Sequence, residues 1–283
     1  MADSFKSEVL SIEREGHVAT VWLDRPGARN AMGRAFFDDL VPAMSDVSCD
    51  PEVRAVLIAA RGPHFSVGLD LKEMGSILAG GPGGATSGPK PSMAARARTA
   101  RAAVLNLQHS INAVADCPKP VVAAVHGYCI GGGVDLISAC DIRICATDAV
   151  FSVREAKVAI VADLGSLQRL PRIIGAGHVA ELALTGKDVD AERARAIGLV
   201  NDVYDGGADG VLAAGRALAE EIAANSPVAV QGTKAVLAAN DGRTVAEGLE
   251  YVATWNAGML ASDDLTEAMV AFMEKRPPNF TGG

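Results

Sequence analysis

Residues 120–171 read PVVAAVHGYCIGGGVDLISACDIRICATDAVFSVREAKVAIVADLGSLQRLP, and this stretch holds the clearest structural pattern in the chain. It opens with an almost wholly apolar run, PVVAAVHG, which predicts a strand buried on both faces. A glycine run follows, and a helix is expected from Gly131 onward, with the next strand at residues 141–146 (DIRICA). This order of strand, tight turn and helix indicates an α/β fold.

Three carboxylates within this stretch have apolar, glycine-rich surroundings: Asp135, Glu155 and Asp163. Acidic residues seldom occupy such places unless they are paired or take part in chemistry. The glycine run directly before Asp135 leaves backbone N–H groups free at the start of a helix. Carboxylates beside free backbone donors are suited to proton transfer next to a carbonyl group.

The glycine run does not fit the common nucleotide-binding motifs. Leu136 stands where a dinucleotide fingerprint needs its last glycine, and no Gly-Lys-Ser/Thr follows for a phosphate-binding loop. A purely structural alternative is close packing of backbone on backbone. With Asp135 so near, we favour a functional interpretation of this turn.

The acids also have structural interpretations. Glu155 lies between Arg154 and Lys157, so it could form a surface ion pair. Asp163 precedes Leu-Gly-Ser and could cap a helix. These alternatives stay open on the residues alone. Two other aspartates are expected to be structural: Asp70 at a turn and Asp141 before a strand.

Further elements flank the central stretch. Strands are predicted at residues 17–23 and 54–60, and helices near Gly33 and from Met93 to Asp116. The sequence HFSVGLDLKEM (64–74) indicates a strand, a tight turn and a helix. Residues 79–92 are rich in Gly, Pro and Ser, which is typical of either a surface insertion or a substrate-facing flap. From about Gly206 the pattern is only helical, so we predict a core of residues 1–205 and a helical region of residues 206–283.

Composition excludes several classes of protein. The net charge is −8 and aromatic residues make up 4%, which argues against a nucleic-acid partner. No apolar run is long enough to span a membrane. The N-terminus shows no secretory h-region and the C-terminus no SKL-type signal, so a cytoplasmic protein is expected.

The cysteines do not form a metal-binding motif. Five are present without a CxxC pair, which favours reduced, buried cysteines. His126 and Cys129 are close enough in sequence for a metal site, but core and turn roles are the more common outcome. We therefore expect no metal.

Several segments together resemble the crotonase superfamily of acyl-CoA enzymes. The matching segments, between residues 24 and 280, are DRPGARNAM, HFSVGLDLKEM, HGYCIGGGVDLISACDIRICA, FSVREAKVAI and AFMEKRPPNF. The resemblance implies a spiral of repeated ββα units with a C-terminal α-helical trimerisation domain. It also implies a coenzyme A thioester as the substrate, with no separate cofactor.

Within that superfamily the chain is most similar to the Δ3,5-Δ2,4-dienoyl-CoA isomerases of fatty acid β-oxidation. Hydratases typically have glutamate at both main acid positions and a small residue at the third, where this chain has Asp135, Glu155 and Asp163. Removing a C2 proton from a 3,5-dienoyl thioester gives a dienolate, and protonation at C6 gives the 2,4-diene. One carboxylate would not reach both ends, so two acid/base groups are the simplest solution.

The resemblance also implies a role for individual residues. Glu155 would act at C2 and Asp163 at C6, with Asp135 polarising or orienting the pair. The backbone N–H groups of Leu69 and Gly132 would bind the thioester oxygen as an oxyanion hole. Coenzyme A phosphates need cations, and the residues implied for coenzyme A binding are Arg25, Arg29 and Lys72, with Phe272 and Lys275 from a neighbouring subunit.

The implied assembly is a homo-oligomer, a trimer or a hexamer of two trimers. The cluster Arg96, Arg98 and Arg101 is interpreted as an exposed helix face. Two alternatives remain: an enoyl-CoA hydratase or other crotonase-type enzyme, and a catalytically silent acyl-CoA-binding protein.

Overall fold

Two β-sheets packed among helices form the centre of the fold. The computed structural model describes residues 5–78 and 92–283. The larger sheet has the strand order β1-β2-β3-β4-β6-β9, in which β1 is antiparallel to β2 and the remaining neighbours are parallel. The smaller sheet has the order β5-β7-β8. The strands are β1 (Leu10–Glu15), β2 (Val18–Leu23), β3 (Ala55–Ala60), β4 (Val121–Val125), β5 (Tyr128–Ile130), β6 (Ile142–Ala146), β7 (Val150–Ser152), β8 (Val189–Asp190) and β9 (Asp202–Tyr204).

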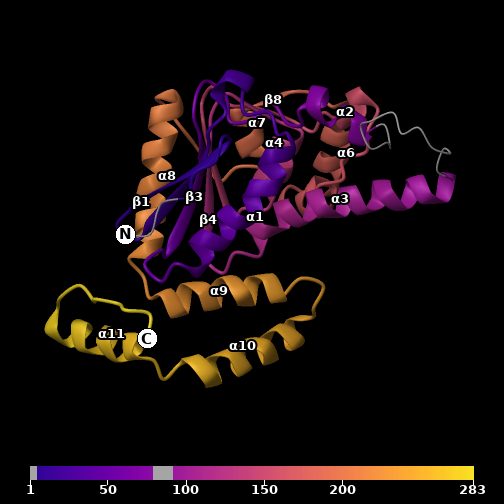
Figure 1. Cartoon of the computed structure of the whole chain (residues 1–283). Helices are drawn as coiled ribbons and strands as arrows, with labels where there is room; N and C mark the ends of the chain where they lie inside the picture. Colours follow the sequence, from indigo (N-terminus) through magenta and orange to yellow (C-terminus); the bar gives the residue numbers. More distant parts are fainter. Residues whose placement is uncertain (1–4, 79–91) are drawn as a thin grey trace.

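Helices follow the strands in a regular order along the chain (Figure 1). The α-helices are α1 (Arg34–Cys49), α2 (Leu71–Leu78), α3 (Met93–Ala115), α4 (Gly132–Ser138), α5 (Ser166–Ile173), α6 (Ala176–Thr185), α7 (Ala191–Ala196), α8 (Gly207–Ala223), α9 (Pro227–Ala239), α10 (Val245–Met259) and α11 (Asp263–Glu274). Two short 3-10 helices are η1 (Pro26–Ala28) and η2 (Glu155–Val158).

From β4 to β7, successive strands alternate between the two sheets. β4 belongs to the larger sheet, β5 to the smaller, and α4 follows, which makes one ββα unit. β6 and β7 repeat the pattern before η2 and α5. An isolated bridge between Ser66 and Cys129 extends it to the turn that follows β3. The predicted α/β spiral of ββα units is confirmed.

The strands β2, β3 and β4 of the larger sheet are buried on both faces. Val56 and Ile58 of β3 belong to the main apolar core, whereas Leu57 between them packs in a second cluster. That second cluster includes Val211 and Ala219 of α8, which lies along the sheet in Figure 1. Burial on both faces explains why β3 and β4 are almost entirely apolar in sequence.

The helices α9, α10 and α11 lie beyond the end of the sheet (Figure 1). α9 and α10 run side by side, and a Cβ at Gly232 would stand only 2.5 Å from the indole nitrogen of Trp255. The glycine therefore allows the ring to lie directly on the backbone of α9. The division at residue 206 remains a prediction: α8 covers the sheet, and the later helices form the separate layer.

The sequence predicted the long elements correctly. α1 begins after Gly33 and runs through Pro42, and α3 begins after Ser92, whose hydroxyl accepts the Ala95 N–H at 3.2 Å. The expected loop of residues 79–92 lies, except for Ser92, outside the described residues. Among the described helices, none is both long and apolar enough to cross a bilayer.

Four of the five free cysteines are buried, as expected, but Cys49 is exposed, which corrects the prediction for that residue. It is the last residue of α1.

Candidate active site

Two glycine turns from separate units meet at one point. Gly68 has φ +83°, and a Cβ there would lie 2.7 Å from the Ile130 carbonyl and 3.3 Å from the Gly132 nitrogen. A Cβ at Gly132 would in turn lie 3.8 Å from the Leu69 nitrogen. Within the described residues, neither the Leu69 nor the Gly132 N–H donates a backbone hydrogen bond. Two free donors therefore lie side by side at the start of α4.

Asp135 lies in the first turn of α4 and is almost completely buried. Its Oδ1 accepts a 2.7 Å hydrogen bond from the Ser166 N–H. Burial raises the pKa of Asp135 to about 6, and the charge of Asp163 acts in the same direction, while the Ser166 hydrogen bond opposes both. This carboxyl therefore titrates close to neutrality.

Glu155 opens η2 and reaches back to the glycine turn. A Cβ at Gly131, which has φ +52°, would stand 2.9 Å from Glu155 Oε1. The other oxygen, Oε2, is buried without a hydrogen-bond partner. Burial raises the pKa of Glu155 to about 7, and the charges of Asp135 and Asp163 add to the rise. A carboxyl with one unpaired oxygen and a pKa near 7 is suited to moving protons at physiological pH.

Asp163 lies on the loop between η2 and α5 and is partly buried. Burial raises the pKa of its carboxyl. Its backbone carbonyl accepts a 2.7 Å hydrogen bond from the side-chain amide of Gln108 on α3. Asp163 lines the same cavity as the other two acids.

One cavity of about 440 Å³ joins all these groups. Apolar side chains from α2, α3 and η2 form much of its wall. The lining residues are Val67, Gly68, Leu69, Leu71, Ala100, Val104, Leu107, Ile130, Gly131, Gly132, Asp135, Arg154, Glu155, Val158, Ala159, Ile160, Asp163 and Leu164. A mostly apolar cavity with a few convergent polar groups is the usual form of a small-molecule site.

The structural alternatives for the acids are wrong. Arg154 pairs with Asp188 and not with Glu155, so the alternative of a surface ion pair with Arg154 is wrong. The N-cap of α5 is Gly165 and lacks a side-chain cap, so Asp163 does not cap that helix.

The two aspartates expected to be structural are so. Asp70 accepts the N–H groups of Lys72 and Glu73 at 3.2 and 3.3 Å. Asp141 accepts the Val121 N–H and pairs with Lys234, both at 2.7 Å.

The early basic candidates lie beside the Leu69 end of the cavity. The Met32 N–H donates to Gly68 O at 2.8 Å, and the Val67 N–H donates to Arg29 O at 3.2 Å. These bonds tie the loop that carries Arg25 and Arg29 to the turn before α2. Arg25 pairs with Asp70 at 3.1 Å, whereas Arg29 and Lys72 are exposed.

The late candidates, Phe272 and Lys275, lie elsewhere in this chain. Both are on the exposed end of α11, and the Phe272 side chain is 85% exposed. Figure 1 places α11 at the opposite end of the molecule from α2 and α3. The structure therefore does not bring these two residues to the cavity of their own chain.

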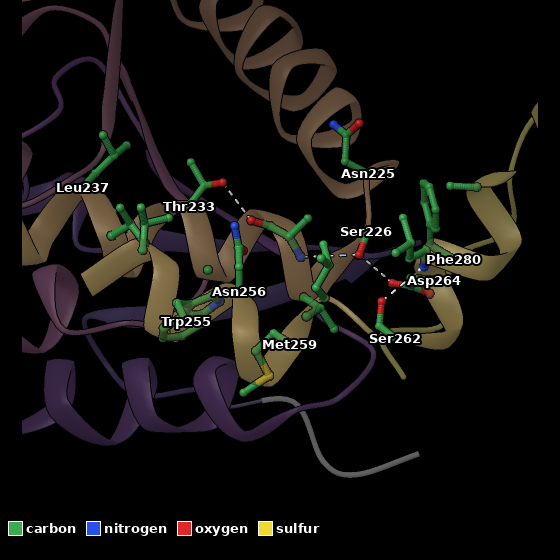
Figure 2. Close-up of a pocket in the computed structure, with 18 residues that line it drawn as sticks. Asn225, Ser226, Thr233, Leu237, Trp255, Asn256, Met259, Ser262, Asp264 and Phe280 are labelled. Atoms are coloured by element: carbon green, nitrogen blue, oxygen red, sulfur yellow. Dashed lines mark hydrogen bonds between the residues drawn. The ribbon is translucent and has the colours of Figure 1, made fainter. Parts of the chain in front are cut away.

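A second cavity, of about 570 Å³, lies among α9, α10 and α11 (Figure 2). Its one carboxylate, Asp264, accepts hydrogen bonds from Ser226 Oγ at 2.6 Å and from the Thr281 and Gly282 N–H groups at 2.8 and 3.1 Å. Burial raises the pKa of Asp264, but these hydrogen bonds outweigh it and lower the pKa below its usual value. Asp264 thus fastens the C-terminal segment and has no free acid/base capacity.

In the part of the chain that the structure describes, no group of three His, Cys, Asp or Glu side chains is placed to hold a metal ion. His126 bonds to the Gly62 carbonyl at 2.8 Å, and Cys129 is fully buried in the core. These two residues have the core and turn roles that the sequence favoured.

Sequence reasoning missed the contribution of α3. Ala100, Val104 and Leu107 line the cavity from one face of this helix, while Arg96, Arg98 and Arg101 are exposed as expected. The spacing of 100, 104 and 107 is helical and could have indicated a buried face. No local pattern marked Gln108.

Comparison with known proteins identifies the family. The sequence profile described as enoyl-CoA hydratase/isomerase matches residues 13–283. The chain belongs to the enoyl-CoA hydratase/isomerase family.

Individual relatives are similar over most of their length. The chain is 42% identical to the peroxisomal Δ(3,5)-Δ(2,4)-dienoyl-CoA isomerase of Arabidopsis thaliana, over 98% of each protein. It is 44% identical to the mitochondrial enzyme of that name from Homo sapiens, over 92% of this chain and 77% of the human protein. The crystal structure of an enoyl-CoA hydratase from Bacillus anthracis superposes with a TM-score of 0.85 at 30% identity, over 97% of this chain and 100% of that one.

These names contradict the expected cytoplasmic location. The relatives named as dienoyl-CoA isomerases are named peroxisomal or mitochondrial. The cytoplasmic location was inferred because a secretory h-region and an SKL-type signal are both missing. The absence of these two motifs does not identify a compartment.

Proposed function

We propose that the protein converts 3,5-dienoyl-CoA to 2,4-dienoyl-CoA in fatty acid β-oxidation. The observation that carries the proposal is the meeting of three carboxyls with raised pKa values, Asp135, Glu155 and Asp163, in one apolar cavity beside two free N–H donors. The names of the similar isomerases support the same reaction.

The reaction begins at the head of the acyl group. The N–H groups of Leu69 and Gly132 donate to the thioester oxygen, where negative charge develops. The Glu155 carboxylate takes a proton from C2, and the C–H electron pair becomes part of a dienolate that extends to C6. Each oxyanion donor contributes roughly 3 kcal/mol to lowering the barrier.

The reaction ends at the far end of the diene. Asp163 gives a proton to C6, and the double bonds move from C3 and C5 to C2 and C4. Glu155 is then protonated and Asp163 ionised, so one proton returns to Asp163 before the next turnover. Asp135 keeps the loop of Asp163 next to the glycine turn and raises the pKa of Glu155 through its charge.

We infer that coenzyme A lies across the Leu69 end of the cavity. Arg25, Arg29 and Lys72 are near that end and supply positive charge for its phosphates. Phe272 and Lys275 would come from a neighbouring subunit, since their own helix lies far from the cavity. This proposal requires a trimer, or a hexamer of two trimers, in solution.

A pair of substrates tests the proposed reaction. A 3,5-dienoyl-CoA should give the absorbance of the conjugated 2,4-diene, while a 2-enoyl-CoA should be hydrated slowly or not at all. Asp163→Asn and Glu155→Gln should each lower isomerisation by about 10²–10⁴-fold, since each removes one proton-transfer group. Fast hydration without diene conjugation would favour the enoyl-CoA hydratase alternative, and unchanged turnover in both variants would refute the mechanism.

A further inference from the structure

The loop that carries Asp163 is fastened to helix α3. The Gln108 side-chain amide donates a 2.7 Å hydrogen bond to the backbone carbonyl of Asp163 itself. The two residues are 55 positions apart in sequence, so this bond is a tertiary contact. Gln108 follows Leu107 on α3, and Leu107 lines the cavity.

A second contact from α3 holds the next residue of the loop. Asn112, one helical turn after Gln108, accepts a hydrogen bond from the guanidinium of Arg169. Arg169 also donates to the Leu164 carbonyl at 3.3 Å. Helix α3 thus holds two consecutive carbonyls of the loop. Gln108 bonds directly to the carbonyl of Asp163, and Asn112 acts on the carbonyl of Leu164 through Arg169.

The rest of the loop is fixed as well. Gly165 has φ +125°, and a Cβ there would collide with the Arg169 guanidinium, so only glycine lets Arg169 fold over the loop. The Ser166 N–H donates to buried Asp135 at 2.7 Å. Every residue from 163 to 166 is therefore constrained, and the contact to Asp163 is made by Gln108.

We propose that Gln108 is a positioning residue for Asp163, which sets the distance between this acid and C6 of the substrate. The inference rests on the proposed function. Gln108 does not line the cavity, and it acts on the backbone of Asp163, not on the substrate. Its loss should impair proton delivery at C6 while leaving proton removal at C2 intact.

The two ends of the reaction can be measured separately. In deuterated water, proton removal at C2 places deuterium in the unreacted 3,5-dienoyl-CoA, and completed isomerisation appears as diene absorbance. In Gln108→Met we expect the ratio of C2 exchange to isomerisation to rise at least about ten-fold, because a misplacement of about 1 Å can cost roughly 10²-fold in rate. KM should change little, since the cavity wall is kept.

Gln168→Met is the matched control, because Gln168 is an exposed residue of α5 and undergoes the same chemical change. It should keep the wild-type ratio. If Gln108→Met fails to fold, the ratio of C2 exchange to isomerisation is measured in Gln108→Glu and should rise in the same way. A carboxylate of the same size repels the Asp163 carbonyl instead of donating to it.

An unchanged ratio overturns the inference, whether both rates stay constant or fall together, because it assigns Gln108 a general structural role. Wild-type protein that neither exchanges nor isomerises instead overturns the proposed function. If wild-type isomerises normally, the result for Gln108 stands on its own.

Discussion

The Asp135 carboxylate accepts a 2.7 Å hydrogen bond from the backbone N–H of Ser166, the first residue of α5. Asp135 itself lies in the first turn of α4. One buried carboxylate thus joins the glycine turn of one ββα unit to the loop that carries Asp163. The arrangement keeps the two proposed oxyanion donors, Leu69 and Gly132, in a fixed relation to Asp163.

The isomerisation rate should depend on pH in a bell shape. The proposed reaction needs one proton on the Glu155–Asp163 pair, and the pKa of Glu155 is raised to about 7 by burial and by the neighbouring acids. The last proton leaves the pair near that pH, so we expect kcat/KM to fall above about pH 7. We also expect kcat/KM to fall in acid, because both carboxyls are then protonated and neither can act as the base. A rate that stays constant from about pH 6 to 9 would contradict this assignment.

Asp135→Asn should move the alkaline limb of that profile to lower pH. The Asp135 charge helps Glu155 retain its proton, so removing the charge lowers the pKa of Glu155. The expected shift is about 0.5–1 pH unit, or roughly 0.7–1.4 kcal/mol. Asp38→Asn, at an exposed position of α1, is the control and should keep the wild-type limb. If the alkaline limb of Asp135→Asn moved to higher pH, the Asp135 charge would not be raising the pKa of Glu155.

Glu155→Gln should stabilise the protein at alkaline pH. Because the pKa of Glu155 is higher in the folded state, folding binds a proton between the unfolded pKa and about 7, and stability falls as pH rises through that window. Since part of the carboxyl keeps contact with solvent, we expect Glu155→Gln to gain about 1 kcal/mol at pH above 7 and nothing in acid.

Thermal unfolding at about pH 5 and 8 measures this difference, with Glu221→Gln on the exposed side of α8 as control. Equal melting temperatures of wild type and Glu155→Gln at both pH values would argue against a buried, destabilising charge.

Gly68→Ala should damage the proposed oxyanion hole while leaving the three proposed acid side chains unchanged. The new Cβ would lie 2.7 Å from the Ile130 carbonyl and would push the Leu69 and Gly132 donors apart. Loss of one donor costs roughly 10²–10³-fold in kcat. Gly175→Ala separates this effect from backbone strain, because Gly175 has a similar φ of +79° but nothing within 4 Å of its Cβ. Equal kcat losses in the two variants would show that strain alone is responsible.

Much of the site could be predicted because its parts are local. The glycine turn, α4 and Asp135 are contiguous, and a strand followed by glycines predicts free N–H groups at a helix start. The pairing of roles between Glu155 and Asp163 came from the family resemblance. Short strands such as β5 and β8 were missed, since two or three residues are too few to show an alternating pattern.

The contacts that hold the site were not predictable from local sequence. Gln108 meets Asp163, and Asn112 meets Arg169, only because α3 packs beside α5 in the folded chain. Nothing in the residues around Gln108 distinguishes it from a surface glutamine. For Glu155 the sequence left a surface ion pair open beside a role in chemistry, and only the folded chain shows that Arg154 pairs with Asp188.

The Trp255 ring packs directly against the backbone of Gly232, and this contact has a practical consequence for work with this chain. The ring sets the separation of α9 and α10, so the short connection around Gly242 does not have to hold them together. A Cβ at Gly242 would meet nothing within 4 Å. A peptide tag inserted at that bend should leave the helix pair in register, and none of the bend residues lines the cavity that holds the three acids.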